Sequence, residues 1–237
     1  MPVISSSACA KLILLGEHAV VYGQPALAIP FSGLKVRCVI EPWINGLTGT
    51  LHIKARELQL NHPLQVLPED NFLRKAVELV LAELGVSQTP TCKLTIYSDI
   101  PISAGLGASA AIAVATMRAL SAFLGHPLEK ETLNRLGFET ERLMHGNPSG
   151  IDNTVIVYEQ PILFRKGELI EFVYPSKNLH FLIADSGIKK ATADTVAYLA
   201  QQRERNPQLI EAALAEIGNF ALFGKKAFEQ GDLSALG

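Results

Sequence analysis

The sequence predicts an α+β fold, and three observations support this prediction. Short β-rich runs bounded by turn residues recur along the first part of the chain. Residues 108–124 are hydrophobic almost all round, which indicates a helix buried on most of its faces. Helical patterns return at residues 191–202 and 207–230, after Pro175 and its polar neighbours interrupt the periodicity. We therefore expect a mixed-sheet domain that ends near Pro175, followed by a second domain.

The elements of the first domain can be justified in order. Five short β-rich runs between turn signals are expected to form strands, at residues 11–15, 26–30, 34–40, 51–55 and 93–97. Residues 71–84 interrupt them as a helix, since apolar residues recur there at three- and four-residue spacing before Gly85. Beyond the central helices we expect a hairpin over residues 161–173, around Lys166-Gly167, and a buried strand over residues 179–185.

Composition excludes several classes of protein. With 237 residues, of which 48% are hydrophobic, the chain can bury a sizeable core, and its net charge of −2 provides no field for nucleic acid or an anionic membrane. The three cysteines are widely spaced and odd in number, so they fit neither a disulfide framework nor a zinc site and favour a cytoplasmic protein. No apolar run approaches the roughly 20 residues that span a bilayer, and residues 12–15 lack the basic flank of a signal peptide.

Two acidic residues flank a predicted turn. Residues 128–145 show a helical spacing of leucines, Gly146 is suited to end that helix, and the following Asn-Pro favours a turn. Glu141 therefore leaves the end of the helix, and Asp152 lies on the far side of the turn. Two carboxylates placed in this way can divide a metal-binding role and a base role. Taken alone, they also fit a solvated helix charge and a capping aspartate.

A glycine-rich loop joins the strand at 93–97 to the apolar helix. It consists of Ser103, Ala104, Gly105, Leu106, Gly107, Ala108 and Ser109. Such a loop offers backbone N–H groups at a helix N-terminus, which suits a polyphosphate, and the hydroxyl of Ser109 could ligate Mg²⁺. Other phosphate-loop and nucleophile motifs fit less well. The Gly-Lys-Ser/Thr of a Walker loop is absent, and Ala111 stands where a serine-hydrolase elbow needs glycine. A Rossmann unit would need a second strand after the apolar helix, but the residues from Leu128 onward show a helical pattern.

The amino-terminal strand carries a charged residue at each end. Lys11 begins an apolar run, and Glu17 and His18 follow it in a Gly-Glu-His turn. A lysine among apolar side chains loses hydration, so we expect a carboxylate or a bound anion to pair with it. As isolated residues, Lys11 also fits a charge on an edge strand and His18 a loop residue.

Together these segments resemble the signature motifs of the GHMP kinases. The spellings Gly-Glu-His-Ala-Val-Val-Tyr-Gly at 16–23 and His-Gly-Asn-Pro-Ser-Gly-Ile-Asp-Asn at 145–153 are most similar to those of its mevalonate kinases, and residues 185–192 are similar to the stretch that opens the family's C-terminal domain. The resemblance implies a two-domain GHMP kinase fold. Residues 1–175 would form the ATP-binding N-terminal domain, and residues 176–237 would begin an α/β-sandwich domain. We expect this second domain to be incomplete, because the family's third glycine-rich motif is not found.

The resemblance also implies a reaction, in which ATP phosphorylates the C5 hydroxyl of mevalonate in the cytoplasm, as a step of isoprenoid synthesis. The loop at 103–109 would bind the phosphates of ATP, and Ser109 and Glu141 would hold Mg²⁺. Asp152 would act as the base, or only orient the alcohol, with Lys11 as its electrostatic partner. The residues implied for the substrate pocket are Glu17, His18 and Thr192.

Two alternatives to mevalonate kinase stay open at this point. One is another GHMP small-molecule kinase, acting on homoserine, phosphomevalonate or a sugar, and the other is a non-catalytic nucleotide-binding relative. The chain also departs from the family pattern, since Cys9-Ala10 replaces the usual Pro-Gly and Ala108 replaces a serine of the phosphate loop. The family pattern further implies a homodimer.

Overall fold

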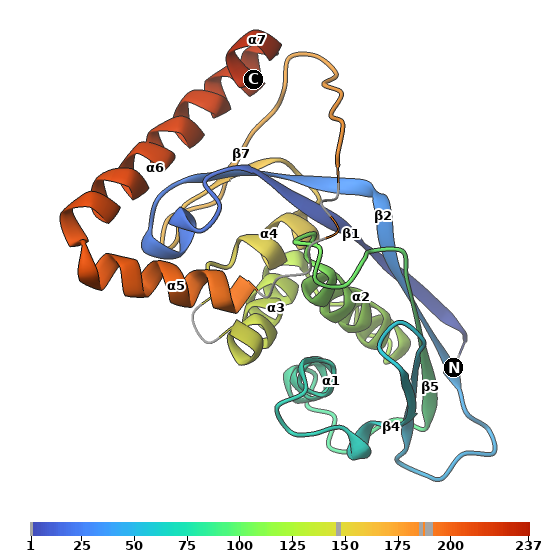
Figure 1. Cartoon of the computed structure of the whole chain (residues 1–237). Coiled ribbons are helices and arrows are strands. Elements are labelled where there is room, and N and C mark those ends of the chain that lie inside the picture. Colours follow the sequence, from blue (N-terminus) through green and yellow to red (C-terminus); the bar gives the residue numbers. More distant parts are fainter. Residues whose placement is uncertain (1, 146–147, 185–186, 188–191) are drawn as a thin grey trace.

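A mixed sheet forms the centre of the molecule (Figure 1). The computed structural model describes residues 2–145, 148–184, 187 and 192–237. In these residues the sheet has seven strands in the order β4-β3-β5-β2-β6-β7, with β1 paired to β2 beside this path. The β3–β5 pair is parallel and the other pairs are antiparallel, which confirms the predicted α+β class. The strands are β1 (Ile4–Leu15), β2 (Ala26–Pro42), β3 (Leu51–Ala55), β4 (Leu60–Pro63), β5 (Cys92–Ser98), β6 (Ile162–Phe164) and β7 (Glu171–Phe172).

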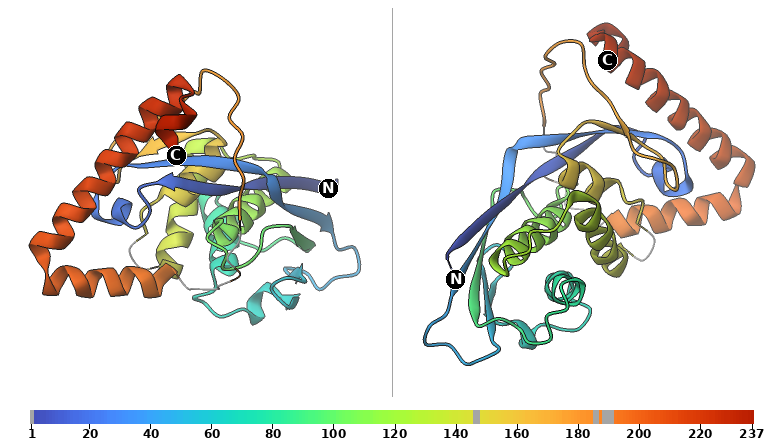
Figure 2. Two further views of the ribbon diagram at one scale, coloured as in Figure 1. Left: turned by 45° about the horizontal axis from the view of Figure 1, so that its top comes forward. Right: turned by 180° about the vertical axis from the view of Figure 1, so that it is seen from behind.

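The helices form two groups. In the first, α2 and α4 contact the strands β1 and β2, and α1 and α3 pack against these helices. In the second, α6 contacts β1, β2 and β6 and meets α5 at a corner, as the further views in Figure 2 show. No helix among the described residues is long and apolar enough to cross a bilayer. The helices are α1 (Phe72–Glu83), α2 (Ala108–Phe123), α3 (Lys130–His145), α4 (Ile151–Tyr158), α5 (Thr192–Arg205), α6 (Pro207–Gln230) and α7 (Leu233–Leu236), with short 3₁₀ turns η1 (Ala19–Tyr22) and η2 (Leu64–Val66).

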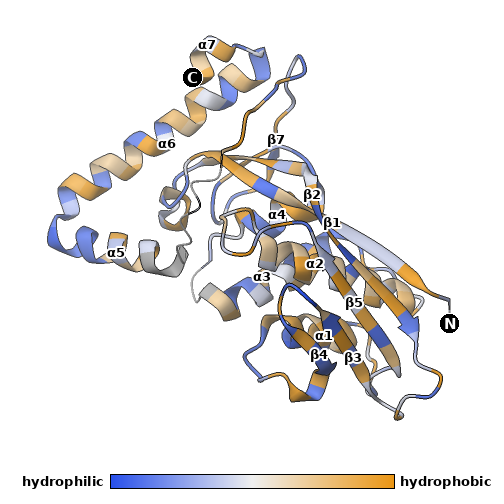
Figure 3. Cartoon of the chain, turned by 45° about the vertical axis from the view of Figure 1, so that its right-hand side comes forward, coloured by the Kyte–Doolittle hydropathy of each residue, from blue (hydrophilic) through white to orange (hydrophobic). Residues whose placement is uncertain are grey.

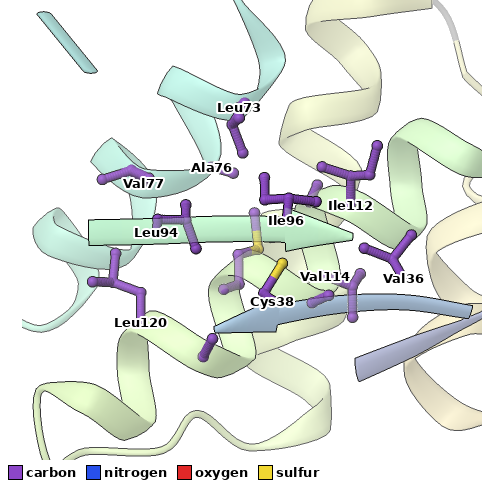
Figure 4. Close-up of a cluster of buried hydrophobic side chains, with 14 of the residues drawn as sticks. Val36, Cys38, Leu73, Ala76, Val77, Leu94, Ile96, Ile112, Val114 and Leu120 are labelled. Carbon is purple, nitrogen blue, oxygen red and sulfur yellow. The ribbon is translucent and has the colours of Figure 1, made fainter. Parts of the chain in front are cut away.

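The largest part of the core lies between α1, α2 and the strands β2 and β5. Figure 4 shows Ile96 of β5 beside Ile112 of α2, and Leu94 of the same strand nearer Val77 of α1, with Cys38 of β2 below Ile96. Along β3 and β5, hydrophobic and hydrophilic residues alternate (Figure 3), and the buried positions follow that alternation. Helix α2 is buried on almost every face, as its composition predicted.

The first residues of β2 are covered on both faces. Ala26 and Ala28 pack in one cluster with Ile151 of α4, whereas Leu27 packs in another with Phe228 of α6. This division follows from the two-residue period of a strand, which sends alternate side chains to opposite faces. Helix α4, which covers one of these faces, carries Asp152 of the candidate site in its first turn.

Most predicted elements are confirmed, with small differences at their ends. The helix expected at residues 71–84 is α1, where the Asn71 side chain accepts N–H bonds from Leu73 and Arg74 at 3.0 and 3.2 Å. The strands expected at 26–30 and 34–40 form one strand, β2. The register of its pairing with β1 shifts between Cys9 and Ala10. An irregularity of the bulge type therefore stands where we expected a break between two strands, at residues 31–33.

One expectation about the later segments is wrong, and three elements of the structure were not predicted at all. Residues 179–184 form no strand, and Leu182 is 99% exposed, so the predicted buried strand is wrong over the described part of its range. An apolar run becomes a strand only where a neighbouring strand can accept its hydrogen bonds, and none of the described strands pairs with it. Helix α4 was not predicted, because its β-branched residues have low helix propensity, which tertiary packing overrides. Strand β4 and helix α7 were also not predicted.

Candidate active site

Four residues predicted from separate motifs lie together at one end of the central helices. Lys11 Nζ of β1 is 3.0 Å from Asp152 Oδ1, which stands in the first turn of α4. Ser109 Oγ, in the first turn of α2, donates a hydrogen bond of 3.4 Å to Glu141 Oε1 of α3. The Lys11 side chain is 7% exposed and that of Asp152 28%. The ammonium group is therefore buried, and the carboxylate beside it remains accessible to a small molecule.

Glu141 is the most strongly perturbed acid of this cluster. It is only 4% exposed, and burial raises the pKa of its carboxyl to about 7. The nearby charge of Asp152 also raises this pKa, while Lys11 and the hydrogen bond from Ser109 lower it. The cluster holds two carboxyl groups and one ammonium group, so it carries a net negative charge once both acids are ionised, which suits a bound cation.

The donor set fits a magnesium ion that is bound together with phosphate. Among the described residues, no three side chains of His, Cys, Asp or Glu converge into a complete metal site. Mg²⁺ in nucleotide sites takes only one or two protein oxygens and completes its shell with phosphate oxygens and water. A buried carboxylate in contact with a hydroxyl, as at Glu141 and Ser109, supplies such a partial set.

The glycine-rich loop lies directly against Lys11. The Lys11 N–H donates to Leu106 O at 3.1 Å, and Gly105 and Gly107 have φ values of 75° and 74°. A side chain at Gly107 would place its Cβ 3.0 Å from Lys11 Cγ, so both the conformation and the close approach require glycine there. Helix α2 begins at the next residue without a side-chain cap among the described residues, which leaves its first N–H groups available to an anion.

The predicted substrate residues lie in a different environment. Glu17 and His18 line a cavity of about 540 Å³ whose other walls come mainly from apolar side chains of α5, α6 and α7. Within the part of the chain that the structure describes, no hydrogen bond or ion pair joins either residue to Lys11 or Asp152. We place the candidate site at the polar cluster, because the cavity beside Glu17 and His18 lacks the paired charges that acid–base chemistry needs. Thr192 begins α5, and its side chain lies outside the described residues, as do positions 146–147 of the predicted turn.

Comparison with known proteins identifies the family of this chain. The model of the GHMP kinases N terminal domain matches residues 71–160, which contain the loop, Glu141 and Asp152. The mevalonate kinase of Thermococcus gammatolerans is 34% identical over 91% of this chain and 67% of its own length. This chain belongs to the GHMP kinase family. The mevalonate kinase of Pyrococcus abyssi is likewise 34% identical over 91% of this GHMP kinase and 66% of its own length, so the chain spans about two thirds of these relatives.

Solved structures of the family share the fold of this GHMP kinase. The L. major mevalonate kinase in complex with R-mevalonate has a TM-score of 0.78 and 28% identity, covering 98% of this chain and 71% of that one. The Methanococcus jannaschii mevalonate kinase has a TM-score of 0.76 at 22% identity, covering 100% of this chain and 75% of that one. The fold class expected from the motifs is therefore confirmed.

Sequence reasoning missed the residues that join the two acidic helices. Asn153 Nδ2 donates to Asn134 Oδ1 at 2.6 Å, and Thr154 Oγ1 lies 3.2 Å from the same oxygen. One signal was available in the sequence: Asn134 precedes Glu141 by seven residues, which places both on one face of α3. Its partners were not predictable, because α4 itself was not predicted.

Proposed function

We propose that this GHMP kinase phosphorylates mevalonate, using ATP, at the C5 hydroxyl to give 5-phosphomevalonate. The observation that carries the proposal is the convergence of Lys11, Ser109, Glu141 and Asp152 beside a glycine-rich helix start. Phosphoryl transfer requires positioned groups and charge neutralisation more than covalent chemistry by the protein. This cluster offers both, and the named relatives with 30% identity or more are mevalonate kinases.

Asp152 is proposed as the residue that receives the hydroxyl proton of the acceptor. Its carboxylate is accessible, and Lys11 holds it from the buried side at 3.0 Å. A base must lie within hydrogen-bond reach of the proton that it accepts, and an ion pair restricts the carboxylate to one orientation. The ammonium of Lys11 also provides positive charge next to the reacting oxygen.

The loop at 103–109 is proposed to bind the phosphates through its N–H groups. Bound ATP supplies the phosphoryl group, and Mg²⁺ neutralises the charge on its phosphate oxygens. Ser109 and Glu141 would hold the metal ion, which requires Glu141 to be ionised. Because the pKa of Glu141 is about 7 without a cation, cation binding and loss of that proton are coupled.

Further parts of the proposal rest on the family alone. We extend to this chain the domain division at residue 175, the homodimer, the cytoplasmic setting, and the placement of Glu17, His18 and Thr192 around mevalonate. A kinase for homoserine, phosphomevalonate or a sugar receives no support from the named relatives described above. A non-catalytic relative would have no need of the Lys11–Asp152 pair.

The decisive experiment measures ADP release with ATP and Mg²⁺ against a panel of mevalonate, phosphomevalonate, homoserine and galactose. We expect turnover with mevalonate alone. The Asp152→Asn variant is the matched control, because it removes the proposed base and would reveal ADP formed by a contaminating enzyme. Turnover with another acceptor, or no turnover in a chain that still binds ATP, would contradict the proposed function.

A further inference from the structure

The two carboxylates of the candidate site stand on different helices, and a buried polar contact joins those helices away from the site. We infer that Asn134 is a positioning residue, which holds α4 against α3 and thereby sets Asp152 relative to Glu141. The inference deepens the proposed function, on which it rests, but the contact can also be tested without measuring turnover.

The contact consists of hydrogen bonds to one side-chain oxygen. Asn134 Oδ1 accepts a bond of 2.6 Å from Asn153 Nδ2 and faces Thr154 Oγ1 at 3.2 Å. Asn153 Nδ2 also donates to the Asn134 backbone oxygen at 3.1 Å. Asn153 and Thr154 are each 2% exposed, whereas Asn134 is half-buried. Thr154 Oγ1 also lies 2.6 Å from Gly150 O, so Asn153 Nδ2 is the buried donor that depends on Asn134. Asn134 thus secures the residues that directly follow Asp152.

Glycines allow the two helices to approach each other between this contact and the acids. A Cβ on Gly137 would lie 3.1 Å from Asn153 Cβ, and one on Gly150 would lie 3.2 Å from Phe138 Cδ2. Asn134, Gly137, Phe138 and Glu141 therefore follow one face of α3, about 10 Å from end to end by helix geometry. The α3–α4 contact begins at Asn134 and ends beside the acidic pair.

The polar groups explain why the contact fixes one arrangement of the helices. Apolar packing alone tolerates small sliding of one helix over another, whereas a buried donor that loses its acceptor is strongly disfavoured. In the described residues Asn153 Oδ1 accepts no hydrogen bond, so the amide is held through its Nδ2 alone. A shift of α4 would break these bonds and move Asp152 by the same amount. Displacements of about 1 Å at a reacting group can reduce turnover about 100-fold.

The test compares three substitutions. Asn134→Leu removes the acceptor at similar volume, Asn134→Asp keeps an acceptor oxygen, and Asn71→Ala removes the cap of α1 and serves as the control for a loss of stability elsewhere. We expect Asn134→Leu to lower kcat with mevalonate by about 10- to 100-fold while KM for ATP changes less than about two-fold. Asn134→Asp should restore kcat, and Asn71→Ala should leave it unchanged.

Amide hydrogen exchange provides the readout that needs no activity. Asn134→Leu should speed exchange at residues 152–156 without changing exchange in α1, and Asn71→Ala should do the reverse. Unchanged exchange in α4, an Asn134→Asp variant as impaired as Asn134→Leu, or an equal loss of kcat in Asn71→Ala would overturn the inference. If Asn134→Leu does not fold, Asn134→Ala removes the same acceptor oxygen and leaves the hydrogen bond from Thr154 Oγ1 to Gly150 O in place. A faster exchange in α4 would then support the inference, and unchanged exchange would refute it.

Discussion

Replacing Glu141 by glutamine should stabilise the metal-free protein while abolishing its proposed activity. Glutamine has nearly the same shape and can still accept the hydrogen bond from Ser109 Oγ, but it removes a charge that is only 4% exposed. A residue that serves a ligand at the expense of the unliganded fold is expected at a binding site.

The magnitude follows from the pKa of Glu141. Its carboxyl titrates at about 7 in the folded chain, against 4.5 for an unperturbed glutamate, mainly because it is buried. Between these two values the native state keeps a proton that the unfolded state has lost, so the free energy of unfolding falls as pH rises through this window. The full shift corresponds to about 3 kcal/mol at pH 8, and to less than about 1 kcal/mol at pH 5.

Thermal unfolding in EDTA at pH 5 and pH 8 measures this difference. With an unfolding entropy of about 2 cal/mol/K per residue, 3 kcal/mol corresponds to about 6 °C in Tm for a chain of 237 residues. Glu141→Gln should therefore raise Tm by about 6 °C at pH 8 and by about 1 °C at pH 5. Glu139→Gln is the matched control, since Glu139 pairs with Arg142 on the surface of the same helix and should show no such dependence on pH.

Two outcomes would refute this reasoning. A Tm gain of equal size at both pH values would show that Glu141 is not protonated in the native state at low pH. A lower Tm at pH 8 would show that the carboxylate makes stabilising contacts that outweigh its burial.

The remaining predictions concern the ion pair and the loop. Asp152→Asn should lower turnover with mevalonate by about 10³-fold while Tm changes little, as steady-state kinetics and circular dichroism would show, and an active variant would exclude the base role. Gly107→Ala should lower the free energy of unfolding, measured in urea, by more than the roughly 1–2 kcal/mol of a left-handed alanine, because its Cβ also meets Lys11. Gly125→Ala is the control, because Gly125 has a φ of 85° and no atom lies within 4 Å of a Cβ placed there, so only the left-handed backbone conformation should cost free energy. An equal loss of unfolding free energy in the two variants would contradict the contact with Lys11 as a cause.

The elements that sequence reasoning placed correctly are those controlled by local chemistry. The spacing of apolar residues and the polar cap at Asn71 located α1, and the glycines at 105 and 107 located the loop before α2. Local signals failed for α4, whose β-branched residues would suit a strand, and for residues 179–184, which have no described partner strand. In both cases the outcome depended on what the rest of the chain offered for packing.

The sequence by itself selected the candidate residues for the proposed chemistry, because motifs are defined by the types of side chain and their local spacing. It assigned Lys11, Ser109, Glu141 and Asp152 to three separate motifs; the chemistry of Lys11 predicted an anionic partner, and the family resemblance implied Asp152. The tertiary structure alone decided that the two charged groups lie 3.0 Å apart, and that Glu141 is buried deeply enough to raise the pKa of its carboxyl to about 7. Pairing and burial depend on how distant segments pack together, which no local pattern encodes.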